Sequence, residues 1–438
     1  MSKIANLIKL RKDPGVRSIG IYTFSNFFAK GASFLLLFVF TNPAYILPSE
    51  NGLLSLFSNS LLFLMPFLSM GIIQSSSTDF FKLGKEEFRS FFTTGFLLPV
   101  IVMVLSFLAL FIFRVQLQKT YGFPFMFVWL IPLITFLTFC SEQLLGLARN
   151  NNEPMIFLKA NVTKTILEIG LSFVLVVFFS WRWQGRIAGI LVAYLVVGIY
   201  AFYYFISRNY LFGSIKKEHI RGELLFAIPI IAMQASVFTM SASDKFFLSN
   251  MVADKNETVG IYSIGCVFAS IVFLFSSALI QYVFPKLYNL LASPVVDYRS
   301  IRKHFRVYFS VMAAGTLGVI ILTPVLYHFF IHEKYHSALR YSYLLCAGYF
   351  LWAIAYFFYS YLLYHKRKKK ILALSFASII ISLACNYFFI GRWHEMGAAI
   401  AVFTCYLIVL ILTLIFTKEF WGKFIFFKSE LESTGRLS

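Results

Sequence analysis

The feature that most constrains this chain is a series of apolar segments, each roughly 20 residues long, which is the length of helix that crosses a bilayer. The 438 residues are 59% hydrophobic and 13% charged. A soluble domain carries about 25% charged residues, because its exterior must be hydrated. The composition therefore excludes a soluble enzyme and any disordered or collagen-like chain. We predict an all-α polytopic membrane protein.

Polar breaks between the apolar runs divide the chain into twelve predicted membrane helices. An even number of crossings places both ends of the chain on the same side of the membrane. The expected extents are 18–41, 52–77, 91–113, 123–147, 160–180, 187–207, 223–249, 259–283, 305–330, 337–364, 372–390 and 397–417.

The distribution of basic residues predicts the orientation of these helices. The net charge is +20, from 39 Lys and Arg against 19 Asp and Glu. Segments on the side of the termini hold 29 of the Lys and Arg, and the opposite loops hold 8. Cytoplasmic loops carry this excess, so we expect both termini in the cytoplasm. We interpret the basic run at 365–370 as part of this bias rather than as a nuclear signal, and we expect no nucleic-acid partner.

All five cysteines fall inside apolar spans, which indicates small core residues rather than disulfides or metal ligands. These are Cys140, Cys266, Cys346, Cys385 and Cys405. The basic N-terminus precedes an apolar run that continues past Phe40 without a small-residue cleavage pattern, so we expect a retained first helix rather than a signal peptide.

An internal repeat relates the two halves of the chain. Gly52 and Gly260 open the second and eighth spans, Gly189 and Gly397 open the sixth and twelfth, and both pairs are 208 residues apart. Six helices in each unit insert in the same orientation, so we predict two parallel six-helix bundles, as in many transporters. The expected divisions are 1–212 for the first bundle, 213–222 for a cytoplasmic linker, 223–417 for the second bundle and 418–438 for a cytoplasmic tail.

Five ionisable residues inside the predicted spans are candidates for a function: Lys30, Glu142, Glu168, Asp244 and Lys245. Each is unfavourable within a bilayer unless it meets a cavity or a partner. We expect the two lysines, which lie in the first helix of each half, to line a cationic cavity and bind an anionic group such as a phosphate. The acids are candidate sites for a coupling proton or cation.

Each acid also has a structural interpretation. Glu168 could pair with Lys164 one turn earlier, and Glu142 is close enough to the interface to reach water. Asp244 and Lys245 are about 100° apart on a helix, so we expect that they do not neutralise each other.

Pro66 and Pro229 are candidates for kinks used in gating, with ordinary helix packing as the alternative.

Residues His332 to His336 spell H-E-x-x-H, a pattern that on a helix binds Zn²⁺ with the glutamate as general base. A membrane zinc protease using His332, Glu333 and His336 is therefore an alternative from another functional class. The pattern lies in a short predicted loop, and no Asp, Glu or His follows in the next span to supply a third ligand. We expect no metal site here.

Several loose motifs resemble those of bacterial polysaccharide (O-antigen, Wzx-type) flippases of the multidrug/oligosaccharidyl-lipid/polysaccharide (MOP) exporter superfamily. The segments "SDKFFL" and "VGIYS" carry the resemblance most clearly. Together the resembling segments are 48–52, 70–72, 243–248, 259–263, 335–338 and 397–401. Before the segment 335–338, His332 stands where the family has a glycine.

The resemblance implies a MATE-like fold and a transporter rather than an enzyme. Its expected activity is to flip a polyprenyl-diphosphate-linked oligosaccharide to the outer leaflet of a bacterial inner membrane by alternating access. Expected partners are the lipid-linked substrate, membrane lipids, and the polymerase and chain-length machinery of surface polysaccharide synthesis. No cofactor is expected, although relatives couple transport to an H⁺ or Na⁺ gradient. A cation-coupled multidrug exporter of the same superfamily is the alternative.

Overall fold

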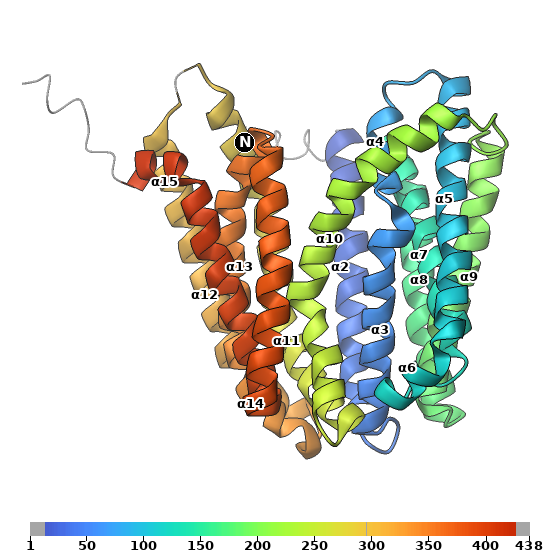
Figure 1. Ribbon diagram of the computed structural model, residues 1–438, viewed down its shortest axis with the longest axis vertical. Helices are drawn as coiled ribbons and strands as arrows, with labels where there is room; N and C mark the ends of the chain where they lie inside the picture. The colour runs from blue at the N-terminus through green and yellow to red at the C-terminus, as the bar shows by residue number, and fades with distance from the viewer. Residues whose placement is uncertain (1–13, 295, 426–438) are drawn as a thin grey trace, which may run out of the picture. The chain divides into compact units, whose positions relative to one another are not determined.

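The computed structural model describes residues 14–294 and 296–425 (Figure 1), and these ranges contain helices and no strands. Contacts divide the chain into two compact units, Met1–Gln234 and Ala235–Ser438. The helix α10 (Lys217–Met251) runs through the division, so its first part belongs to unit 1 and its second part to unit 2.

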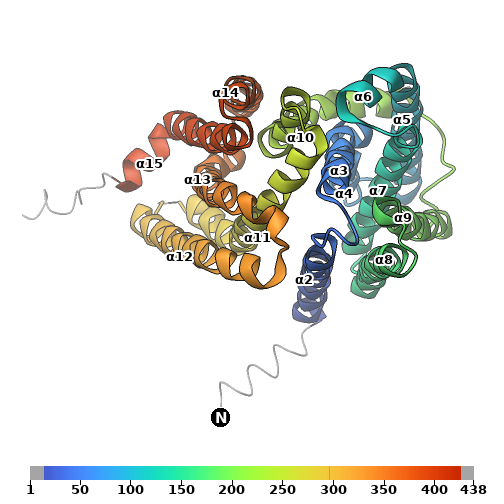
Figure 2. The same ribbon diagram turned by 90° about the horizontal axis from the view of Figure 1, so that it is seen from below.

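In unit 1, α7 occupies the middle position and packs against α3, α4, α5, α8 and α9 (Figure 2). The helix α8 continues without interruption into a short π-helical turn, η1. The elements of unit 1 before α10 are α2 (Pro14–Phe40), α3 (Pro48–Ser69), α4 (Ile72–Asp79), α5 (Lys85–Ile112), α6 (Arg114–Tyr121), α7 (Phe127–Asn150), α8 (Pro154–Phe173), η1 (Val174–Phe178) and α9 (Arg182–Ser207).

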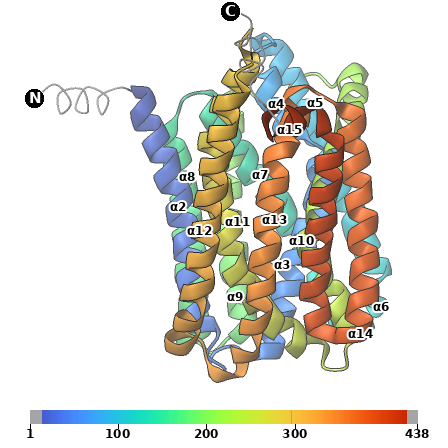
Figure 3. The ribbon, with the colours of Figure 1, turned by 90° about the vertical axis from the view of Figure 1, so that its left-hand side faces the viewer.

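In unit 2, α13 lies between α12 and α14 and also packs against α11 (Figure 3). The elements after α10 are α11 (Lys255–Ala292), α12 (Tyr298–Phe330), the 3₁₀ turn η2 (Glu333–Ala338), α13 (Leu339–Tyr364), α14 (Lys368–Phe416) and α15 (Lys418–Ile425). Asp297 caps α12, and hydrogen bonds from Ser300 hold the pKa of its carboxyl below the usual value.

The helices confirm the predicted fold class. Ten helices in the described part of the chain are long and apolar enough to cross a membrane. One of them, α14, breaks at Trp393 and His394, where the φ of His394 is +46°, so it comprises two crossing segments. With α14 counted as two and α2 included, the described residues contain the twelve helices that the hydropathy pattern predicts.

The span predicted at 52–77 is two helices rather than one. Met70 and Gly71 both adopt left-handed conformations, with φ of +47° and +74°, and they separate α3 from α4. Pro66 does not itself end α3, since the helix continues to Ser69. A Cβ on Gly71 would lie 2.9 Å from the side chain of Ile230 on α10, so this break packs closely against α10.

Gly189 and Gly397, one of the two glycine pairs with the 208-residue offset, both lie where backbones approach closely. A Cβ on Gly189 would lie 2.3 Å from Ser172 Oγ and 2.7 Å from the Ser172 amide nitrogen, across the hairpin of α8 and α9. A Cβ on Gly397 would lie 2.0 Å from the carbonyl oxygen of Phe389, across the break in α14. The repeat therefore keeps glycine at a tight hairpin in each half.

Aromatic side chains form much of the core of unit 1. Phe92 and Phe96 of α5 meet Phe205 of α9 at centroid distances of 5.3 and 5.9 Å, and Phe96 lies 5.6 Å from Phe139 of α7. All four rings are buried. Because lipid tails are as apolar as these rings, helix association here depends on close packing rather than on exclusion of water.

The outer faces of several helices are apolar and exposed within their own units. In α5 and α12, only 17% of the most apolar 18-residue window is buried. Side chains such as Ile112 and Ile321 are 69% and 67% exposed. Soluble proteins do not leave such long apolar faces in water, so these faces are suited to contact lipid.

The limits predicted for the two bundles, the linker and the tail remain predictions. Within the predicted linker 213–222, the residues from Lys217 onward form the first turns of α10. The segment before them is bonded to α5, since Thr93 Oγ1 accepts a hydrogen bond from the Gly213 amide at 2.9 Å and Thr94 Oγ1 accepts one from the Lys216 amide at 3.2 Å. This connecting segment is therefore attached to unit 1.

Candidate functional site

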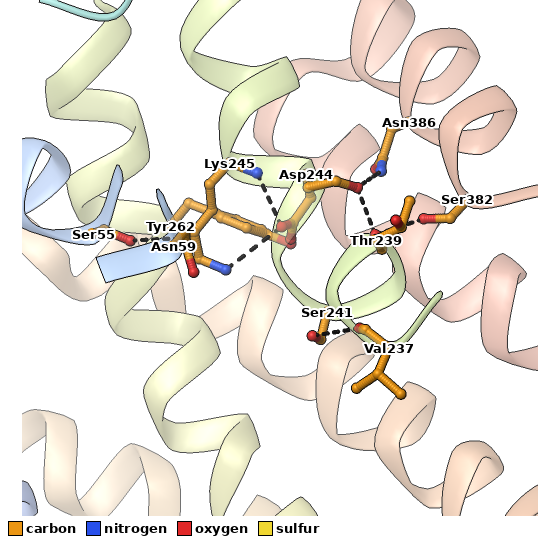
Figure 4. A network of polar contacts seen from close by, with 11 residues as sticks. Ser55, Asn59, Val237, Thr239, Ser241, Asp244, Lys245, Tyr262, Ser382 and Asn386 are labelled. Atoms are coloured by element: carbon orange, nitrogen blue, oxygen red, sulfur yellow. Dashed lines mark hydrogen bonds and ion pairs between the residues drawn. The ribbon is translucent and has the colours of Figure 1, made fainter. Parts of the chain in front are cut away.

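Three of the Asp, Glu, Lys and Arg side chains in the described part of the chain are buried, and two of them are neighbours on α10: Asp244 and Lys245, which are 2% and 6% exposed (Figure 4). Lys245 Nζ lies 3.5 Å from Asp244 Oδ1. Tyr262 Oη, from α11, donates a hydrogen bond of 2.7 Å to Asp244 Oδ2, and the Lys245 amide donates one of 2.9 Å to Oδ1. The carboxylate is thus contacted by a cation and by hydrogen-bond donors from both α10 and α11.

The expectation that Asp244 and Lys245 do not neutralise each other is wrong. Their Cβ atoms leave the helix in different directions, but the four-carbon stem of the lysine is long enough to return its ammonium to the neighbouring carboxylate. Lys245 Nζ also lies 5.9 Å from the centroid of the Tyr262 ring. The two charges therefore compensate each other inside unit 2.

The same tyrosine connects the two segments that carried the sequence resemblance. Asp244 lies in the segment 243–248 and Tyr262 in the segment 259–263, which come from α10 and α11. Their hydrogen bond joins the two segments across the two helices.

A second polar network joins α10 to the first part of α14 beside this pair (Figure 4). Asn386 Nδ2 donates a hydrogen bond of 3.0 Å to Ser243 Oγ, and Ser382 Oγ donates one of 2.8 Å to the Thr239 carbonyl. Asn386 Oδ1 is buried and has no hydrogen-bond partner within the described part of the chain. Unit 2 thus places a buried charge pair and a buried amide acceptor at neighbouring positions along α10.

Unit 1 contains a separate charged cluster within its spans. Arg186 of α9 pairs with Glu168 of α8, with Nη2 2.7 Å from Oε1, and both side chains are less than a fifth exposed. Arg186 Nη1 also donates a hydrogen bond of 3.0 Å to Ser172 Oγ. The predicted pair of Glu168 with Lys164 is therefore replaced by an ion pair between two helices.

Lys164 instead lies 5.3 Å from the centroid of the Tyr194 ring on α9. Glu142 of α7 is half-buried, and it acts electrostatically on Tyr194 together with Lys164 and Glu168. Charged side chains from α7 and α8 thus converge on one tyrosine of α9. Such a balanced cluster is the kind of group that lines a polar path within a membrane protein.

Three of the predicted site residues take part in none of the contacts described above. Lys30 lies on α2, but its side chain is outside the described residues. Pro66 is buried inside α3, and Pro229 lies exposed inside α10. Cavity lining by the lysines and gating by the prolines remain predictions.

The H-E-x-x-H segment spans the residue before η2 and most of η2 itself. A 3₁₀ turn has three residues per turn, so residues four apart do not share a face as they do on an α-helix. His332 Nδ1 accepts a hydrogen bond of 3.3 Å from the Lys334 amide, and His336 Nε2 lies 3.0 Å from the Ile331 carbonyl oxygen. No group of three His, Cys, Asp or Glu side chains suited to a metal occurs among the residues that the structure describes.

Two further residues with polar contacts inside unit 1 do not stand out in the sequence. Arg186 was assigned to a loop, and Glu223 was the first residue of a predicted span, although it is 2% exposed. Ser75 Oγ lies 3.0 Å from Glu223 Oε2. Both are ionisable residues at the end of a predicted span. A side chain at that position can reach water as easily as a partner in the protein, so the sequence does not indicate which of the two it contacts.

Comparison with known families gives a match over residues 16–291 to the family described as polysaccharide biosynthesis protein. The chain belongs to this family. The match confirms the predicted membership of a polysaccharide family. A comparison with curated protein sequences finds no match.

Solved structures similar to this polysaccharide biosynthesis family member share its fold at low identity. An inward-facing multidrug resistance MATE family transporter of the MOP superfamily has a TM-score of 0.69 and 12% identity, over 93% of this chain and 96% of the transporter. The lipid II flippase MurJ, in an inward closed conformation, has a TM-score of 0.72 and 13% identity, over 91% of this chain and 87% of MurJ. A MOP superfamily transporter from Pyrococcus furiosus has a TM-score of 0.53 and 13% identity, over 95% and 98%. The predicted MATE-like fold is confirmed.

Proposed function

We propose that the protein flips a polyprenyl-diphosphate-linked oligosaccharide from the cytoplasmic to the outer leaflet of a bacterial inner membrane, for synthesis of a surface polysaccharide. The observation that carries this proposal is the match to the polysaccharide biosynthesis family over residues 16–291. The similarity to MurJ, which is named as a lipid II flippase, supports a lipid-linked substrate. Both termini would lie in the cytoplasm, as the basic loops favour.

The proposed substrate has a diphosphate, and the chain offers basic residues for it inside the spans. Lys30 is our principal candidate, because a lysine in the first helix of a bundle can meet a phosphate as a point charge. Lys245 is the second candidate, and binding of a substrate there would require its ammonium to leave Asp244. The oligosaccharide would be delivered to the polymerase and chain-length machinery, and membrane lipids would surround the protein.

The acidic residues are proposed to take part in coupling to an H⁺ or Na⁺ gradient. Glu142 is the most available of the three, since it is half-buried and its side chain forms no ion pair in the described structure. Glu168 and Asp244 are each paired with a cation, so protonation of either would have to accompany a rearrangement of its partner. Alternating access would take place without a cofactor.

Export of cationic drugs is a second candidate function, favoured by the similarity to a multidrug resistance MATE transporter. Exporters of cations would depend on membrane acids more than on lysines. Deletion of the gene would then increase susceptibility to cationic dyes. Unchanged susceptibility, together with loss of the surface glycan, supports the flippase.

The flippase proposal predicts that Lys30→Ala lowers export of the surface glycan by at least about tenfold, because a charge-assisted contact contributes about 1.5–3 kcal/mol. Lys30→Arg keeps the charge and should retain export. The variants are compared in a strain that lacks other flippases, at equal amounts of protein in the membrane. Lys82→Ala, which removes an exposed ammonium, is the control. Normal export by Lys30→Ala would contradict a substrate role for Lys30.

A further inference from the structure

Glu223 is a buried acid that none of the proposed transport roles uses. It lies in the first part of α10 and is 2% exposed, and Ser75 on α4 is 5% exposed. Glu223 Oε2 and Ser75 Oγ are 3.0 Å apart. Both residues belong to unit 1, so this contact is internal to one compact body.

The hydrogen bonds of Ser75 depend on the protonation of Glu223. Ser75 Oγ lies 3.2 Å from the carbonyl oxygen of Ile72 and 3.0 Å from Glu223 Oε2, but the hydroxyl has one hydrogen to donate. If the glutamate is charged, both oxygens compete for that hydrogen. If the glutamate is neutral, it donates to Ser75 Oγ, Ser75 donates to Ile72, and every group is satisfied.

The charges around Glu223 also favour the neutral form. From α4, Asp79 acts on it with the same sign of charge, and Asp79 is itself paired with the exposed Lys82 at 3.3 Å. From its own helix, His219 lies one turn earlier and presents its ring to Phe91 of α5 at 5.6 Å. Glu223 has no ion pair with a basic residue in the part of the chain that the structure describes. A buried carboxylate without a cation is strongly disfavoured relative to the neutral acid.

This contact joins α10 to a short helix, α4, which also packs against α5 and α7. The helix α4 has eight residues and is separated from α3 by the left-handed pair Met70 and Gly71. At its start, Gly71 packs against Ile230 of α10, and one turn later Ser75 meets Glu223. Loss of the second contact would leave α4 attached to α10 at one end only.

We propose that Glu223 is a proton-binding site that controls the attachment of α4 to α10. The neutral carboxyl donates its hydrogen to Ser75 Oγ and holds the two helices together. When the proton passes to water, the carboxylate must be hydrated, and α4 separates from α10 to admit water. The proposal does not depend on the identity of the cargo, so it stands or falls separately from the flippase proposal.

The protonation state is tested by infrared spectroscopy of the full-length protein in lipid nanodiscs. We expect a carbonyl stretching band of a protonated carboxyl at neutral pH, which is absent from Glu223→Gln. Glu218→Gln, which changes an exposed glutamate on the same helix, should retain the band. A spectrum of Glu223→Gln that keeps the whole band would overturn the proposal, because Glu223 would then be charged.

The attachment of α4 is tested by hydrogen–deuterium exchange over residues 72–79, corrected for intrinsic exchange with pH. In the wild type, we expect exchange to increase between mildly acidic and mildly alkaline pH, whereas Glu223→Gln should remain protected throughout. Ser75→Ala should exchange fast at every pH. If Glu223→Gln does not fold, the wild-type profile and Ser75→Ala decide the matter. Exchange in the wild type that is independent of pH would contradict the proposal.

Discussion

Lys245→Ala is expected to lower the free energy of unfolding by about 3–5 kcal/mol, because it removes the cation from a buried ion pair and leaves the other charge behind. Asp244 would keep its hydrogen bonds from Tyr262 and from the Lys245 amide, but these do not replace the ammonium. The measurement is unfolding of the purified protein by SDS in mixed micelles, followed by circular dichroism.

Two further variants separate the ion pair from simple truncation of the lysine. The double variant Asp244→Asn/Lys245→Met removes both charges and should recover most of the loss. Lys82→Ala removes the cation of the exposed pair with Asp79, where the lysine side chain is 68% exposed, and should change stability by at most about 1 kcal/mol. Equal losses for Lys245→Ala and Lys82→Ala would show that the buried pair is not what stabilises this region.

Gly189→Ala is expected to lower the free energy of unfolding by about 1–3 kcal/mol, because one added methyl forces two packed helices apart. The new Cβ would lie 2.3 Å from Ser172 Oγ and 2.7 Å from the Ser172 amide nitrogen, and a backbone atom cannot move aside as a flexible side chain can. Separation of α8 from α9 would also strain the ion pair of Glu168 with Arg186. Melting of the detergent-solubilised protein measures the effect.

Gly170→Ala is the matched control for this change. Gly170 lies on α8, in the same hairpin, and a Cβ there would have no heavy atom within 4 Å. Alanine is favoured over glycine in a helix by up to about 1 kcal/mol, so this variant should be neutral or more stable. A melting temperature of Gly189→Ala equal to that of Gly170→Ala would mean that α8 and α9 are not in close contact at this point.

The membrane helices could be predicted from the sequence, because a bilayer requires long apolar segments and leaves few alternatives. The breaks within them could not. Met70 and Gly71 lie inside a continuous apolar run, and a single glycine in such a run does not distinguish a break between two helices from close packing within one helix. The predicted span 52–77 ends near the last residue of α4, but the prediction did not include the break between α3 and α4.

The sequence indicates several charged residues of the candidate site but does not indicate how they pair. Asp244, Lys245 and Glu168 stood out because charge is rare within a membrane span. Sequence spacing favoured Lys164 as the partner of Glu168, yet the partner is Arg186, eighteen positions later on the next helix. Pairing between helices depends on how they cross, which the spacing along one helix does not contain. The spacing of Asp244 and Lys245 along one helix also does not indicate that the lysine side chain returns its ammonium to the neighbouring carboxylate.

The most direct test of the central claim is an analysis of lipids from a deletion strain of the source organism that lacks other flippases. We predict that a polyprenyl-diphosphate-linked glycan accumulates while the surface polymer disappears, and that the wild-type gene reverses both effects. This result would place the protein at the flipping step. An unchanged surface polymer with no accumulation of the lipid-linked glycan would contradict the account.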